Sequence, residues 1–127
     1  MFKLIFSDEA LEFIHEQSAE FKRQGLDKPV VALFYYSTES WLMSFCGNVV
    51  ELVEKDKVVN DMDFFQWNDT NIGNYHSEIE KVEIYIEEKV LEELENKPMV
   101  IIDAVTKETK DSKVGMLFMK KESNVYD

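Results

Sequence analysis

Residues 82–94 read VEIYIEEKVLEEL, and this stretch decides the fold. Its first half alternates apolar and mostly acidic residues, and this period of two predicts a half-buried strand over 82–87. Its second half spaces apolar residues as a helix does, which predicts a short helix over 88–94. Pro98 then ends the helical pattern. Residues 82–94 therefore predict a strand that runs directly into a short helix.

Upstream of this point, the N-terminal region predicts a strand followed by a long helix. Residues 2–6 are apolar apart from one lysine, and Ser7 is a good N-cap because its hydroxyl can accept a hydrogen bond from the first helical turn. Apolar residues then recur at helical spacing until about Gln24. Gly25 can end the helix in the left-handed conformation.

The middle of the chain predicts further strands. Residues 30–36 read VVALFYY, and this continuous apolar run predicts a strand buried on both faces. Residues 37–40 are polar and predict a turn. Two strand segments follow at 41–46 and 49–53, with Gly47-Asn48 between them as a tight turn or, as we prefer, a bulge in one long strand.

The rest of the chain completes the expected order. Residues 54–80 are irregular and predict a long excursion with one edge strand. Two strands, at 99–105 and 114–119, are separated by a charged turn. Because no repeat or linker divides residues 1–127, we expect a single β-rich α+β domain of curled mixed sheets with one long and one short helix.

Four segments of this layout resemble the HesB/A-type iron–sulfur biogenesis family. They are residues 5–11, as an opening strand and helix start, and 82–94, 100–103 and 114–119, as the later strands and short helix. The resemblance implies a HesB-like pseudobarrel and a role in iron–sulfur biogenesis. Family members that bind metal place one cysteine in a glycine-rich turn after the second strand and two near the C-terminus.

The chain departs from this ligand pattern. The corresponding turn, at 37–40, holds neither glycine nor cysteine, and residues 120–127 contain no cysteine. Cys46 is the only cysteine, and it lies beyond the turn in an apolar context. We therefore expect a divergent member that binds no cofactor or metal and acts as a non-catalytic accessory or interaction domain, with no assigned site residues.

Composition excludes some partners and points to a compartment. The chain has 26 acidic and 14 basic residues, a net charge of −12. Nucleic acids and anionic membranes both attract clusters of Lys and Arg, so we expect neither as a partner. The N-terminal apolar run is too short for a signal peptide, and with a single thiol this predicts the cytoplasm.

Two alternatives remain open from the sequence. One is a ligand binder or small enzyme in which Cys46 and His76 cooperate with nearby acids, since a thiol needs a base to become a nucleophile. The other is a homo-oligomer or protein-binding module whose interface uses Phe64, Phe65 and Trp67. For these aromatic residues, packing over the end of a sheet is the default interpretation.

Overall fold

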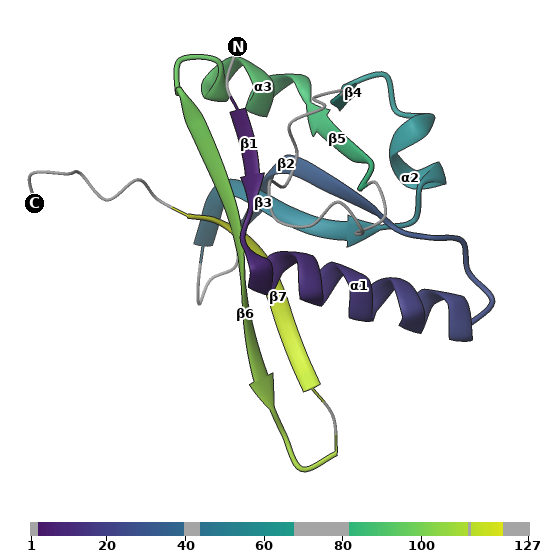
Figure 1. Ribbon diagram of the computed structural model, residues 1–127. Coiled ribbons are helices and arrows are strands. Elements are labelled where there is room, and N and C mark those ends of the chain that lie inside the picture. The colour runs from purple at the N-terminus through teal and green to yellow at the C-terminus, as the bar shows by residue number, and fades with distance from the viewer. Residues whose placement is uncertain (1–2, 40–43, 68–81, 112, 121–127) are drawn as a thin grey trace, which may run out of the picture.

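The computed structural model describes residues 3–39, 44–67, 82–111 and 113–120. These residues contain seven strands and three helices (Figure 1). Their order is β1 (Lys3–Phe6), α1 (Asp8–Arg23), β2 (Val30–Glu39), β3 (Ser44–Val53), α2 (Asp56–Val59), β4 (Phe64–Trp67), β5 (Ile84–Glu87), α3 (Glu88–Leu94), β6 (Met99–Glu108) and β7 (Lys113–Lys120). The predicted α+β class with mixed sheets is confirmed.

The strands form two open sheets. In the first, with order β1-β6-β7, β1 is parallel to β6 and β7 is antiparallel to it. In the second, with order β3-β2-β5-β4, β2 and β5 are parallel and the outer pairs are antiparallel. Strand pairing in the described part of the chain closes no barrel.

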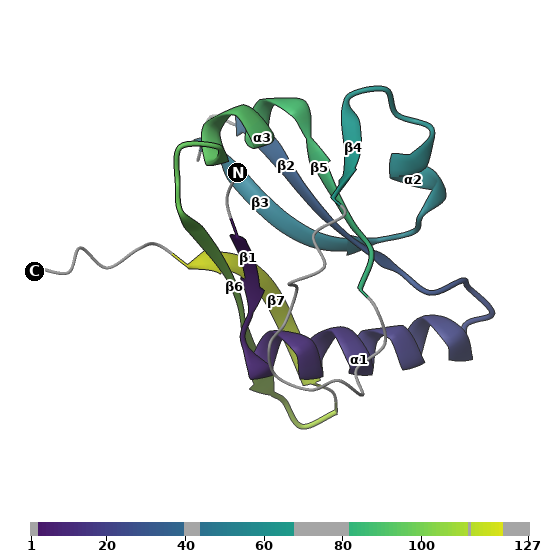
Figure 2. The ribbon, with the colours of Figure 1, turned by 45° about the horizontal axis from the view of Figure 1, so that its top comes forward.

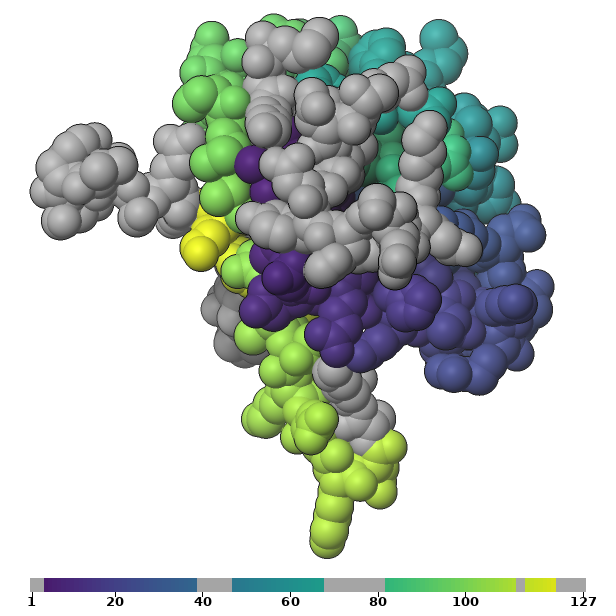
Figure 3. All heavy atoms as spheres, in the orientation of Figure 1, coloured from purple at the N-terminus to yellow at the C-terminus, as the bar shows by residue number. Residues whose placement is uncertain are grey.

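Helix α1 connects the two sheets in space. It starts against β6 and then runs below the second sheet, in both views of the ribbon (Figures 1 and 2). The hairpin of β6 and β7 extends beyond the helix, and Figure 3 shows its far end projecting below α1 in green and yellow. Helix α1 therefore lies next to both sheets.

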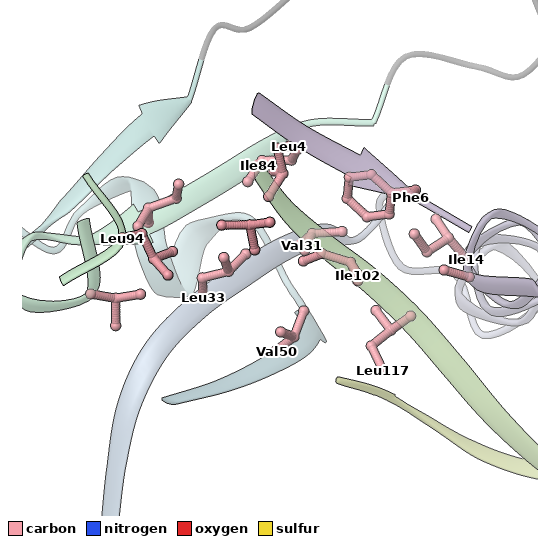
Figure 4. Close-up of a cluster of buried hydrophobic side chains, with 14 of the residues drawn as sticks. Leu4, Phe6, Ile14, Val31, Leu33, Val50, Ile84, Leu94, Ile102 and Leu117 are labelled. Atoms are coloured by element: carbon pink, nitrogen blue, oxygen red, sulfur yellow. The ribbon is translucent and has the colours of Figure 1, made fainter. Parts of the chain in front are cut away.

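One apolar core joins the two sheets and α1. Figure 4 shows Leu4 and Phe6 of β1, Ile14 of α1 and Ile102 of β6 gathered with side chains of the second sheet. The side chains that β2 contributes are Val31 and Leu33. Burial of this apolar surface is the main favourable term for folding, at about 25 cal/mol per Å².

A second, smaller cluster covers the opposite face of the second sheet. It contains Val30 and Ala32 of β2, Val58 of α2 and Tyr85 of β5. Over residues 30–33, β2 is thus buried on both faces, as predicted. The prediction was wrong for the end of the 30–36 run, where Tyr35 and Tyr36 are 38% and 47% exposed. The prediction that β5 is half-buried was wrong, because β5 lies between β2 and β4 and Tyr85 packs under α2.

Two local predictions in the middle of the chain were also wrong. Residues 37–39 continue β2, since Glu39 pairs with Ser44, so the turn does not begin at 37. Gly47 and Asn48 form neither a turn nor a bulge, because they pair one-to-one with Tyr36 and Tyr35. The continuous pairing with β2 overrides the weak strand preference of the glycine.

The helix ends agree better with the sequence. Ser7 caps α1 and its hydroxyl accepts a hydrogen bond from the Ala10 amide, while Gly25 adopts the left-handed conformation with φ of 78°. Helix α3 covers the predicted residues and buries Val90 and Leu94. The described part of the predicted excursion, 54–67, contains the short helix α2 and the edge strand β4. Its residues 68–80 lie outside the described residues.

Among the described residues, the helices are too short or too polar to cross a membrane.

Candidate functional site

Among the described residues, one concavity is a cleft bounded by α1 and by two strand edges. Strand β3 is the outer strand of the second sheet, β7 is the outer strand of the first, and the two lie against each other. The cleft has a volume of about 430 Å³. It is lined by Phe13, Gln17 and Phe21 of α1 and by residues 48–52 and 115–118 of the two strands. We call it the edge cleft.

Gly115 sets how closely α1 approaches β7. A Cβ atom at this position would lie 2.7 Å from Cε1 of Phe13 and 2.9 Å from Cγ2 of Thr106. Only glycine fits without displacing these groups, because real Cβ atoms do not come so close to neighbours. The Phe13 ring therefore lies over the bare backbone of β7, at the boundary of the cleft.

The lining of the edge cleft is mainly apolar, with few polar groups. Met116 is 59% exposed, so its thioether side chain is accessible from solvent. The polar lining residues are Gln17, Asn48 and Glu51. The Asn48 amide donates a hydrogen bond of 2.8 Å to Glu93 of α3, which places a second carboxylate beside this strand. An apolar surface with a few polar groups is typical of binding sites of this size.

Ser7 and Asp103 form the most connected polar cluster at the start of α1. The Ser7 hydroxyl donates a hydrogen bond of 2.6 Å to Oδ1 of Asp103, and the Ala104 amide donates to the same oxygen at 2.8 Å. The hydrogen bond from Ser7 is the main cause that lowers the pKa of the Asp103 carboxyl, and the hydrogen bond from the Ala104 amide lowers it further. The hydroxyl also caps α1, so the cluster fixes the helix start to β6.

A second, polar hollow of about 350 Å³ is lined by Tyr35, Asp63, Glu87, Glu88 and Lys89. The Glu87 carboxylate accepts a hydrogen bond of 3.0 Å from the Tyr35 amide, and Nζ of Lys89 lies 4.8 Å from the centre of the Tyr35 ring. The Glu88 amide donates to the Asp63 carbonyl at 2.8 Å. These charged residues therefore hold the local structure together. Within the described ranges, no three His, Cys, Asp or Glu side chains are grouped so that they could hold a metal ion.

The structure places only part of the predicted Cys46–His76 pair. The backbone of Cys46 belongs to β3 and pairs with Ser37 of β2. Its side chain, and the whole of His76, lie outside the described residues. Cooperation between the thiol and the imidazole therefore stays a prediction.

The predicted aromatic cluster divides between the core and the surface. The rings of Phe64 and Phe34 pack edge to face with centroids 6.5 Å apart, and Trp67 packs against the main core. Phe65 is 47% exposed on the edge strand β4. Packing accounts for Phe64 and Trp67, and Phe65 is the member of the three that reaches the surface.

No family model, curated protein or solved structure matches this chain. The resemblance to the HesB/A-type family stays a prediction, and the case for a site rests on geometry.

The sequence did not single out the residues of the edge cleft. Phe13 and Phe21 fit the apolar face of a helix, and residues 115–118 fit a strand. The one local signal was Gly115, because a glycine inside a strand often marks a close approach of another element.

Proposed function

We propose that this protein is a non-catalytic interaction domain that holds apolar side chains of a partner polypeptide in the edge cleft. The observation that carries the proposal is the cleft itself, an apolar concavity of about 430 Å³ between α1 and two strand edges. Pockets of roughly 300–1,000 Å³ that combine an apolar lining with a few polar groups are the usual form of a binding site.

The chemistry of the lining favours binding over catalysis. General acid–base catalysis needs titratable groups within hydrogen-bond reach of the reacting atoms. Among the described lining residues, Glu51 is the titratable group, and Gln17 and Asn48 can only donate or accept hydrogen bonds. Such a lining can orient a ligand but offers no acid–base pair.

The family context is part of the same proposal. The four segments that resemble the HesB/A-type family support an accessory role in iron–sulfur biogenesis without a bound cluster or other cofactor. The single cysteine, Cys46, supports the cytoplasm as the compartment. The net charge of −12 favours a protein partner over a nucleic acid or an anionic membrane.

Fragment binding followed by NMR tests the proposal. Indole, p-cresol and isoamyl alcohol imitate the side chains of Trp, Tyr and Leu, and each is titrated into the ¹⁵N-labelled full chain. We expect amide shifts to concentrate in residues 48–52 and 115–118, because these line the cleft. Met116→Glu should weaken binding by about threefold or more, since a charge in an apolar site costs desolvation energy.

Met62→Glu is the matched control. Met62 is 92% exposed between α2 and β4 and does not line the cleft, so the same charge there should leave the fragment affinity unchanged. Shifts scattered over the surface, or equal effects of the two variants, would overturn the proposed site.

A homo-oligomer is the second candidate function, because exposed apolar side chains also gather around the edge strand β4. Val59, Met62 and Phe65 are 51%, 92% and 47% exposed. An edge strand with exposed apolar residues favours pairing with another chain. Sedimentation velocity of the full chain over a range of concentrations decides between a monomer and an oligomer.

A further inference from the structure

We infer that the occupant of the edge cleft is an extended, basic peptide segment that adds to β3 as a new strand. This inference rests on the proposed function and names the class of its partner. It combines the outer position of β3 in the strand order of the described residues, the apolar side chains of α1 in the cleft and the carboxylate of Glu51 on the lining.

Strand β3 is an outer strand of its sheet and borders the cleft. Among the described strands, β2 is the one paired with β3, because β3 stands last in the order β3-β2-β5-β4. Residues 48–52 of β3 line the cleft without a break. An outer strand offers N–H and C=O groups as a template for a further strand. The edge that borders the cleft is therefore suited to main-chain pairing.

The length of this edge suits a short peptide. Five residues of a strand span about 17 Å, which is close to the length of an ordinary strand. Successive side chains of an added strand point to opposite faces, so every second side chain of the peptide would face the α1 side of the cleft. Phe13 and Phe21 are both half-buried there and would receive apolar side chains.

Charge favours a basic peptide. Glu51 is exposed on the lining, and Glu93 accepts the hydrogen bond of Asn48 on the same strand. The whole chain carries a net charge of −12. Complementary charges raise the association rate and suppress wrong partners. A Lys or Arg in the peptide would therefore be favoured near Glu51, and an acidic segment would be disfavoured at the same place.

Selection from a random peptide library tests the inference. A phage-displayed library of random dodecapeptides is panned against the immobilised full chain, and selected sequences are synthesised. We expect apolar residues at alternate positions together with Lys or Arg. Glu51→Lys should raise the measured Kd by about tenfold or more, since it replaces an attraction between the carboxylate and the basic peptide with a repulsion. Glu95→Lys makes the same charge change at an exposed position outside the lining and should leave Kd within about twofold.

Backbone methylation separates strand addition from ordinary side-chain docking. In a strand pair, alternate N–H groups of the peptide point toward the template. N-methylation of every second residue in one phase should therefore abolish binding, and methylation in the other phase should be tolerated. Equal tolerance of both phases, or no loss with Glu51→Lys, would overturn strand addition to β3.

The two proposals fail separately. If the fragments bind in the cleft but the library gives no specific peptide, the interaction site stands and the peptide inference falls. If sedimentation shows a dimer that Glu51→Lys dissociates, a second copy occupies the cleft and the inference of a basic peptide is overturned.

Discussion

At the scale of single residues, Ser7 shows how one side chain serves two levels of structure. Its hydroxyl accepts from the Ala10 amide, which caps α1, and donates to Asp103, which lies 96 positions away in the sequence. The capping part was predictable from the sequence, because Ser at the start of an apolar helical pattern is a local signal. The contact with Asp103 was not, because it depends on β1 lying parallel to β6.

The pH dependence of Asp103→Asn tests this cluster. The Ser7 hydrogen bond, with that of the Ala104 amide, lowers the pKa of Asp103 below its ordinary value of 3.8. A lowered carboxyl pKa contributes stability that is present above the ordinary value. The contribution is lost as the pH falls from 3.8 through the folded-state pKa, because the unfolded chain binds the proton first.

We therefore expect Asp103→Asn to lower the free energy of unfolding by about 1 kcal/mol at pH 7, and the difference to shrink at pH 3. Urea unfolding followed by circular dichroism at both pH values measures it. Asp111→Asn, at an exposed aspartate in the β6–β7 turn, is the control and should show no difference. If Asp103→Asn lowers the free energy of unfolding by as much at pH 3 as at pH 7, the proposed role of the carboxylate is contradicted.

At the scale of the elements, the contact between α1 and β7 depends on the absence of a side chain at Gly115. A methyl group there would meet Phe13 on the helix and Thr106 on the neighbouring strand. We expect Gly115→Ala to lower the free energy of unfolding by about 1–3 kcal/mol, because a tightly packed contact cannot absorb the extra volume. Chemical denaturation measures the loss.

A double variant identifies the cause of that loss. Phe13→Leu removes the ring that stands closest to the new Cβ, so Gly115→Ala should cost less in its presence. Gly25→Ala is the matched control: Gly25 has no neighbour within 4 Å of its Cβ position, and its φ of 78° disfavours alanine for a different reason. Phe13→Leu should not rescue it, and additive costs for Phe13→Leu and Gly115→Ala contradict the proposed contact.

At the scale of the whole molecule, the exposed apolar residues near β4 raise the question of self-association. If β4 is an interface, the wild-type chain should associate at high micromolar concentration, and Phe65→Ser should weaken the dimer by about tenfold or more. Sedimentation velocity over a range of concentrations measures this. Val105→Ser changes an apolar residue that is 54% exposed on the other sheet and should have no effect. A strictly monomeric wild type rules out this interface.

The sequence by itself determined the elements and several of their details. Periodicity and end signals are local, so they predicted β1, α1, β2, α3 and β7 and the roles of Ser7 and Gly25. Tertiary structure decided the rest. Whether Tyr85 is buried depends on α2, and whether Gly47-Asn48 turns depends on pairing with β2. The edge cleft exists because β3 and β7 end their sheets and α1 lies beside both. Strand order is set by contacts between distant segments, and those contacts leave no local pattern in the sequence.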